Sequence, residues 1–529
     1  MFATTARKPA VLIGVALAVV AAVVGGAILF TSSKASGVDL TSAKLVPADA
    51  SLYVGMNTDL SSSQWVAAFD LVKRLGQKDP QQALKDAAEA GGDVKWEDDV
   101  APFLGGDASF FMRGGGVGEL ASGGRNFDGA VIFKCNDTAK ALDVIRKRAG
   151  TRLEARSYDG TAYFADESSP GFAAIIGDHL VVAGTESALK AVIDVAHGKA
   201  ASLAANADFI ALRNDLTNNF LGFEYVDLQQ IIDKTLLSDP AIRKVLQQVG
   251  SDSLVLHPIG GAITASDAGF AFQAASKSDN AINPGARPRT SKLASRVPAN
   301  ALFFMSTAGV AQAWQDALTG DTRKQLDKTL NDEGSPLTVD EFLKEAGQEL
   351  GLGSLDEIMK LLSGETALVA WQDAGEKTQG AVLAEVANEA EAKAVLAKLA
   401  ASGKATRVRT VAVNGTEMPV FRDSGGDESA YAVAGGVAIF GTAAGLQTIL
   451  EGKGENLSGS KAYTHSVAGL GTSLGSFMFF NLHEALGSSL GGLVGVGGDP
   501  ALDALEGFML NFVNEKGLAR VSGVVSIAK

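Results

Sequence analysis

The stretch LVPADASLYV, residues 45–54, recurs with small changes as RVPANALFF at residues 296–304. Each copy places a proline just before a run of apolar, aromatic and β-branched residues, which is typical of a chain entering a strand. One strand entrance written twice, roughly 250 residues apart, indicates that the chain contains the same folding unit twice.

Further matches follow in the same order along both halves. They pair FLGGDASFF (103–111) with LLSGETALV (361–369), DGAVIFKCND (128–137) with QGAVLAEVAN (379–388), YDGTAYF (158–164) with VNGTEMPVF (413–421), HLVVAGTESALKAVI (179–193) with GVAIFGTAAGLQTIL (436–450), and FEYVDL (223–228) with the start of FFNLHEAL (479–486). Because the order never breaks, the sequence predicts two tandem homologous repeats, over 45–276 and 296–529. The residues between them, 277–295, are rich in proline, serine and charge, as linkers are.

Local patterns within each repeat predict an α+β fold, a mainly antiparallel sheet with helices packed on it. DG at 159–160 and NG at 414–415 lie between alternating apolar residues. They are typical of type I′ hairpin turns, because both central residues of such a turn need a positive φ. Thr185 and Thr442 each follow a run that reads as a buried strand, and each is placed to cap the next helix.

The N-terminal part contains AVLIGVALAVVAAVVGGAILF at residues 10–30, a segment without a charged side chain. A helix of about 20 such residues spans the hydrocarbon core of a bilayer. Arg7 and Lys8 precede it, so the positive-inside rule places residues 1–9 in the cytoplasm. We therefore expect a single-pass protein of the cell membrane, with an anchor at 10–30, a spacer at 31–44 and the bulk of the chain extracytoplasmic.

A cleavable signal peptide is the alternative interpretation of this segment. Small residues at 33–35 (Ser-Lys-Ala) have the spacing of a cleavage site. However, the apolar core of a signal peptide is only about 7–15 residues long, which favours the uncleaved anchor.

Composition and charge exclude several classes of protein. The chain is 46% hydrophobic and 20% charged and has a formal net charge of −14, so it is globular and repels phosphate backbones; we expect no nucleic-acid binding. Its single cysteine, Cys135, excludes an internal disulfide and a cysteine-based zinc site. The five histidines show no metal-binding spacing. We expect neither a metal site nor a cofactor.

GTSLG at 471–475 matches the G-x-S-x-G pattern, in which Ser473 would be the nucleophile of a hydrolase. That pattern normally follows a strand, whereas here it precedes the predicted strand SFMFFNL. The only later histidine, His483, lies at the far end of that strand, and the corresponding segment of the first half, 212–220, has no serine. We interpret the motif as a glycine-rich loop.

Other loops have weak resemblance to ligand-binding motifs. GVGELA (116–121) meets a loose dinucleotide pattern but no helix follows it, and LGGLVGVGGDP (490–500) lacks the Lys-Ser/Thr pair of a P-loop. The acidic stretches ADESSP (165–170) and RDSGGDES (422–429) do not match a calcium loop. We interpret all four as loops or solvated turns and expect no catalytic or cofactor-binding residue in them.

The match between the halves also tests single residues. Cys135 corresponds to Val386, so we expect a buried thiol that behaves as a small apolar side chain. His179 corresponds to Gly436 and is expected in a turn. His197 is expected at the end of its helix, where a cation or polar group suits the dipole.

Trp65 and Trp314 recur at the first predicted helix of each half, within helical segments expected at about 62–104 and 310–362. Aromatic residues at helical spacing are usually part of the core, which is our interpretation. The alternative is that they form one wall of a groove between helix and sheet for an apolar ligand.

The anchor, the V-P-A-D/N-A strand entrance and the later strand-Gly-Thr-helix element together resemble a bacterial envelope family catalogued as a domain of unknown function. The resemblance covers residues 45–529. It implies an extracytoplasmic bacterial protein and supplies no activity, cofactor or catalytic residue.

Three functions are therefore considered. The first is a non-enzymatic, membrane-anchored module that binds an envelope partner or organises the envelope. The second is a carrier or sensor of an apolar ligand held in a groove between sheet and helices. The third, which the context of Ser473 disfavours, is a serine hydrolase.

Overall fold

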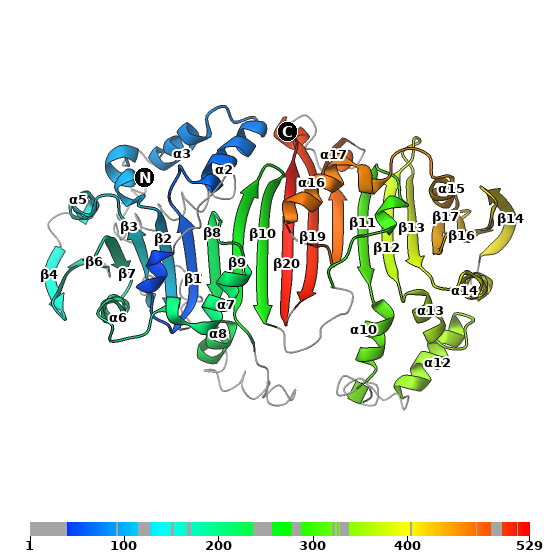
Figure 1. Cartoon of the computed structure of the whole chain (residues 1–529), viewed down its shortest axis with the longest axis horizontal. Coiled ribbons are helices and arrows are strands. Elements are labelled where there is room, and N and C mark those ends of the chain that lie inside the picture. The colour runs from blue at the N-terminus through cyan, green and yellow to red at the C-terminus, as the bar shows by residue number, and fades with distance from the viewer. Residues whose placement is uncertain are drawn as a thin grey trace, which may run out of the picture. The chain divides into compact units, whose positions relative to one another are not determined.

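The computed structural model describes residues 40–90, 94–114, 127–149, 153–166, 171–235, 256–277, 287–319, 323–324, 327, 338–402, 405–471, 473–487, 500–515 and 517–529. The chain divides into two compact units, unit 1 ending at Lys277 and unit 2 formed by Ser278–Ala528 (Figure 1). The segment expected to cross the membrane, 10–30, lies outside the described residues. No helix among the described residues is long and apolar enough to cross a bilayer.

Unit 1 is built on an antiparallel sheet with the strand order β4-β5-β6-β7-β3-β2-β1-β8-β9-β10. The strands are β1 (Ala50–Asn57), β2 (Asp107–Arg113), β3 (Gly129–Lys134), β4 (Leu153–Tyr158), β5 (Thr161–Asp166), β6 (Phe172–Ile176), β7 (His179–Ala183), β8 (Gly222–Val226), β9 (Ile259–Ser266) and β10 (Gly269–Lys277). Its helices are α2 (Ser63–Arg74), α3 (Pro80–Glu89), α5 (Thr138–Ala149), α6 (Glu186–Ala196), α7 (Ala207–Asp215) and α8 (Leu228–Thr235), with short turns of helix at η1 (Thr41–Lys44), η2 (Trp96–Val100), η3 (Ala101–Phe103) and η5 (Leu203–Ala205).

Unit 2 has the corresponding antiparallel order β14-β15-β16-β17-β13-β12-β11-β18-β19-β20. The strands are β11 (Ala301–Ala308), β12 (Glu365–Gln372), β13 (Thr378–Glu385), β14 (Thr406–Val413), β15 (Thr416–Arg422), β16 (Glu428–Ala434), β17 (Val437–Thr442), β18 (Ser476–Asn481), β19 (Leu505–Glu515) and β20 (Leu518–Ile527). Its helices are α10 (Val310–Ala317), α12 (Val339–Glu349), α13 (Asp356–Leu361), α14 (Glu389–Ser402), α15 (Ala443–Glu451), α16 (Lys461–Leu470), α17 (Leu482–Gly487) and α19 (Pro500–Asp503), with η7 (Leu293–Ser295) and η8 (Leu457–Gly459). The predicted α+β class with a mainly antiparallel sheet is confirmed.

The two quoted stretches lead into β1 and β11, as predicted. Pro47 forms a bridge with Ser202, and Pro298 forms a bridge with Asn456. Both strands then show a register irregularity directly after their first residue. Proline lacks the N–H of a ladder, so it is placed at the first contact of the segment with the sheet and not within the strand.

The predicted hairpin turns and helix caps are also confirmed. The central residues of the turns at 159–160 and 414–415 all have positive φ, the geometry that a type I′ turn requires. The side chain of Thr185 accepts the N–H of Ala188 at the start of α6, and that of Thr442 accepts the N–H of Gly445 at the start of α15. Each cap satisfies one N–H group that the first turn of a helix leaves without a partner.

One face of the sheet of unit 2 is buried beneath α15 and α16. Phe304, Phe477 and Phe479 on this face are at most 1% exposed. The ring of Tyr463, from α16, meets that of Phe479 edge to face at 5.5 Å between centroids. Because side chains alternate along a strand, the residues between these aromatic side chains point to the opposite face, on which α14 packs. The candidate site lies on that second face.

Candidate functional site

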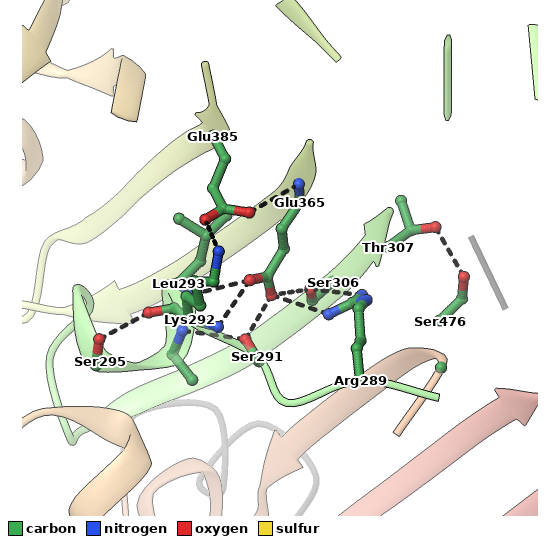
Figure 2. Close-up of polar contacts among 12 residues, drawn as sticks. Arg289, Ser291, Lys292, Leu293, Ser295, Ser306, Thr307, Glu365, Glu385 and Ser476 are labelled. Carbon is green, nitrogen blue, oxygen red and sulfur yellow. Dashed lines mark hydrogen bonds and ion pairs between the residues drawn. The ribbon is translucent and has the colours of Figure 1, made fainter. Parts of the chain in front are cut away.

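A buried polar cluster surrounds Glu365, the first residue of β12, which is 4% exposed (Figure 2). Its carboxylate accepts hydrogen bonds from the hydroxyl of Ser291 at 2.5 Å and that of Ser306 at 2.6 Å. Arg289 donates from Nη1 at 3.1 Å. Two backbone N–H groups at residues 292–293 donate at 2.7 and 3.2 Å. The carboxylate therefore ties the segment before the strand entrance to the sheet.

Asp107 has the same position at the start of β2 in unit 1 and is 1% exposed. It accepts the hydroxyl of Thr41 at 3.1 Å and the backbone N–H of Ser42 at 3.0 Å. Burial raises the pKa of Asp107, while the N–H of Ser42 and the nearby ring of His179 oppose that rise. Both units thus use a buried carboxylate to fix the chain just before the repeated stretch.

The cluster around Glu365 has the properties of a structural element. Five donors fill the acceptor positions of the carboxylate, namely two hydroxyls, two backbone N–H groups and the Arg289 guanidinium, which also balances its charge. The Arg289 guanidinium also lies over the ring of Phe477 at 5.8 Å. A carboxylate held in this way has no free lone pair for proton transfer to a substrate.

Ser473 lines a cavity of about 530 Å³ beside Arg289 and Ser291. The lining contains neither a histidine nor a carboxylate. Ser473 lies before β18 and its carbonyl oxygen accepts the Asn511 side-chain N–H at 3.1 Å, whereas His483 lies in α17 beyond that strand. The described residues of the cavity therefore supply no base that would activate the serine.

An apolar cavity of about 390 Å³ lies in unit 2 between the sheet and the helices α13 and α14. Its lining is apolar except for Ser429, and consists of Ile358, Leu361, Leu362, Val382, Ala384, Leu396, Leu399, Ala400, Ala405, Phe421, Ser429, Ala438, Ile439 and Phe440. Its volume and its apolar walls with one hydroxyl group are typical of a site for a small apolar molecule.

The same positions of the sheet are covered in unit 1. Strand register equates Phe110, Val131 and Val182 of unit 1 with Leu368, Val382 and Phe440 of unit 2. The residues of unit 1 are 8, 2 and 2% exposed, and those of unit 2 are 40, 40 and 49% exposed.

The connection between the second and third strands of each unit explains this difference. Phe127, which follows the long glycine-rich loop of unit 1, packs on Phe110 with ring centroids 5.7 Å apart. In unit 2 the corresponding connection is a short turn, 373–377, that brings no such ring. At these three positions the apolar surface is therefore open in unit 2 and covered in unit 1. Unit 1 has its own apolar cavity, of about 310 Å³, further along the sheet over β1, β8, β9 and β10.

The tryptophans behave differently in the two units. Trp65 of α2 is fully buried and donates from Nε1 to the carbonyl of Asn57 at 2.8 Å, which confirms the prediction for that residue. Trp314 of α10 is only half-buried, and its Nε1 has no partner among the described residues. The prediction that Trp314 lies in the core is wrong, because α2 packs on β9 whereas α10 has α13 as its main neighbour.

The prediction for Cys135 is confirmed and that for His197 is confirmed in its position. Cys135 is 8% exposed, and burial raises the pKa of its thiol to about 11. His197 is the C-terminal capping residue of α6, and its Nδ1 lies 2.5 Å from a carboxylate oxygen of Asp159. Neither residue lies in a cavity with other reactive groups among the described residues.

The prediction for His179 is wrong. It is the first residue of β7, is 7% exposed and lies opposite Lys134. Val437 lies opposite Glu385 in the same way, so Val437, and not Gly436, is its counterpart. The number of residues between the start of this strand and the helix-capping threonine differs by one between the units, and the sequence match between the halves did not show this difference. His179 contacts Thr41 and so belongs to the cluster around Asp107.

The acidic turn at 422–429 is closed by its own backbone. The carboxylate of Asp423 accepts the N–H groups of Gly425 and Asp427, both at 2.9 Å, so it is already occupied. No group of three His, Cys, Asp or Glu residues in the described part of the chain is placed to hold a metal ion. The loops at 116–121, 167–170 and 490–499 lie outside the described residues.

The residues that line the apolar cavity were not singled out by the sequence. A signal was nevertheless present: in β12 and β17 apolar residues occupy both alternating positions, which predicts a strand with two apolar faces. A second signal was the connection between β12 and β13, which is a short turn at 373–377 where unit 1 has a long glycine-rich sequence.

A family model described as "Protein of unknown function (DUF3352)" matches residues 11–508. The chain belongs to this family. The expected resemblance to a family catalogued as a domain of unknown function is therefore confirmed. No curated protein matches this chain.

Among solved structures, crystal form I of TP0453 is similar over 47% of this chain and 81% of its own, with a TM-score of 0.26 and 10% sequence identity. Crystal form III of the same protein is similar over 47% of this chain and 83% of its own, with a TM-score of 0.24 and 9% identity.

Proposed function

We propose that this chain is a single-pass, membrane-anchored extracytoplasmic protein that binds an apolar ligand in the cavity of unit 2 and catalyses no reaction. The observation that carries the proposal is the cavity of about 390 Å³ between the sheet and the helices α13 and α14. Protein interiors are close-packed, so an apolar space of this size that opens onto exposed apolar side chains is typical of a ligand site.

The comparison with unit 1 supports this proposal. An antiparallel sheet with the same strand order closes the equivalent surface with Phe127 and α5. The open surface is therefore not a requirement of the fold. Large side chains exposed at 40–49% cost solubility unless a partner covers them.

The other two functions have less support. An envelope-organising role requires a protein-binding surface, and the exposed Ile263 and Phe272 beside the smaller cavity of unit 1 are the described residues that favour it. A hydrolase using Ser473 requires a base, and the cavity that Ser473 lines contains no histidine or carboxylate.

We also infer that the units arose by tandem duplication. The identical strand order, the irregularity after the first residue of β1 and β11, and the bridges of Pro47 and Pro298 support this inference. The apolar segment 10–30 supports the anchor.

Ligand binding is tested with the full chain in its membrane. A photoactivatable fatty acid that carries a chemical handle is supplied to cells, crosslinked, and mapped to peptides by mass spectrometry. We expect labelled peptides from residues 356–402 and 429–442, next to labelling of 10–30, which any membrane-spanning segment would show.

Two matched variants sharpen this test. Val382→Glu places a charge in the cavity and is expected to lower labelling of these peptides roughly tenfold, because an apolar site solvates a charge poorly. Val408→Glu is the control, because Val408 is similarly exposed at 42% but lies in β14 outside the cavity. Labelling confined to 10–30, or equal effects of both variants, would refute the proposal.

Anchoring is tested separately. The full chain is expected to stay in the membrane pellet after alkaline carbonate extraction, and deletion of residues 10–30 is expected to release it. An intact mass that lacks the N-terminal segment would instead favour the signal peptide.

A further inference from the structure

Beyond the cavity, an apolar row of side chains crosses the face of unit 2 on which α14 packs. Each member is the direct cross-strand partner of the next, so all lie on one face and side by side. The row consists of Phe440 (β17), Val382 (β13), Leu368 (β12), Met305 (β11), Met478 (β18) and Leu510 (β19).

The row is open to solvent over most of its length. Phe440, Val382, Leu368 and Met305 are 49, 40, 40 and 38% exposed, and the last two members are half-buried. No member carries a charge. The first two also line the cavity, so the row continues the cavity over the central strands.

The two sides of the row differ in chemistry. On one side lie the rings of Phe303, Phe480 and Phe508, with 5.0 Å between the first two centroids and 6.2 Å between the last two. On the other side lie the hydroxyls of Thr307 and Ser476, which are 2.7 Å apart. Phe512, the cross-strand partner of Ser476, is 39% exposed, so the hydroxyl groups flank the row over β11 and β18 only.

Unit 1 does not have such a row. Strand register places Glu224 where unit 2 has Met478, and Gly261 where unit 2 has Leu510. A Cβ on Gly261 would lie 2.4 Å from a carboxylate oxygen of Glu224, so the glycine leaves room for that charged side chain. The apolar row therefore depends on residues that differ between two sheets of the same topology.

The length of the row indicates the class of ligand. It makes five strand-to-strand steps from β17 to β19. At about 4.8 Å a step this is about 24 Å, longer than the roughly 15 Å that one leaflet contributes to the hydrocarbon core of a bilayer. The row can therefore cover the full length of one lipid acyl chain.

We infer that the ligand is a single long acyl chain, with one end in the cavity and the remainder laid across the strands along the apolar row. This inference rests on the proposed function. A second copy of the protein is a poorer occupant, because two bodies of net charge −14 repel each other. One acyl chain with its end in the cavity covers both the cavity and the apolar row.

The test compares chain lengths. The full chain is held in amphipol, cis-parinaric acid is the fluorescent probe, and dodecanoic and octadecanoic acids displace it. Each fully buried methylene strengthens binding about fourfold, and a methylene covered on one side about twofold. Octadecanoic acid has about six more methylenes and is therefore expected to bind roughly sixtyfold more tightly than dodecanoic acid.

Met478→Glu gives unit 2 the residue that unit 1 has at this position. It is expected to weaken octadecanoic acid roughly tenfold, because the charge interrupts the apolar row. Dodecanoic acid, which ends before β18, is expected to change by less than about twofold, and its retained binding shows that the variant is folded. Val408→Glu is the matched control, and Leu368→Gln is the second variant of the row.

The outcomes separate the two proposals. Equal affinity of the two acids, or a Met478→Glu variant that weakens both equally, would overturn the acyl-chain inference and leave the cavity as a site for a shorter ligand. Absence of any parinaric acid binding would overturn the proposed function as well.

Discussion

The strongest stability prediction concerns Glu365→Ala. The substitution removes the acceptor of two hydroxyls, the Arg289 guanidinium and two backbone N–H groups, all at a site that is 4% exposed. Breaking a buried ion pair by removing one partner costs about 3–5 kcal/mol, because the other charge remains buried without compensation. We therefore expect the free energy of unfolding of unit 2 to fall by about 4 kcal/mol.

Glu365→Gln is expected to lower the free energy of unfolding by less, about 2 kcal/mol, because its amide oxygen still accepts hydrogen bonds from some of these donors although the charge is lost. The control is Glu385→Ala. The carboxylate of Glu385 is 27% exposed, pairs with Lys292, whose side chain is 77% exposed, and accepts the backbone N–H of Glu365 at 3.2 Å. About 1–2 kcal/mol is therefore expected.

The assay is thermal unfolding of the full chain, followed by calorimetry and by tryptophan fluorescence, to which Trp371, 2% exposed in unit 2, contributes. For a unit of this size 1 kcal/mol corresponds to about 2–4 °C, so Glu365→Ala is expected to lower the transition of unit 2 by about 8–16 °C. A shift equal to that of Glu385→Ala would contradict the prediction, because it would show that the cluster does not hold the strand entrance.

Three further predictions follow from single residues. The Cys135 thiol, whose pKa burial raises to about 11, is expected to resist a maleimide at pH 8 in the folded full chain and to react after denaturation; fast labelling of the folded chain would contradict its buried position. Gly415→Ala is expected to cost about 1–2 kcal/mol because φ is +79° there, while Gly487→Ala, with equally free space and no positive φ, is expected to be near neutral in the same thermal assay. Hydrogen bonds from Arg409 and Arg422 lower the pKa of Glu428 to about 2. The stabilisation that they give is therefore present above the ordinary pKa of 4.5 and is lost as the pH falls through about 2. Arg409→Ala is expected to raise the pKa of Glu428, and a carboxyl titration by carbon NMR that does not change would show that the ion pair is absent in solution.

Local features of the fold could be predicted from the sequence because short segments determine them. The turns at 159–160 and 414–415 needed only two residues that accept a positive φ. The caps at Thr185 and Thr442 needed only a hydroxyl before an apolar helical stripe. The position of His179 was mispredicted because a one-residue difference in strand-to-cap length changes which residue faces which.

The candidate site was harder to predict because it depends on what covers a surface. Sequence indicated apolar residues on both faces of β12 and β17, and apolar side chains there fit both a packed core and an open groove. Trp314 illustrates the difficulty, since its counterpart Trp65 is fully buried and Trp314 is not. Helix position, and not residue type, makes that difference.

The α+β class, the strand entrances, the hairpin turns and the helix caps could all be predicted from the sequence, because each follows from backbone preferences over a few residues. The sequence also pointed to the buried thiol of Cys135. That Phe110 is covered and Leu368 is open could be seen only in the folded chain. Burial depends on the neighbours that reach a side chain, and those neighbours come from distant segments: Phe127 and α5 cover Phe110 in unit 1, whereas unit 2 has only a short turn at 373–377 in the place of Phe127.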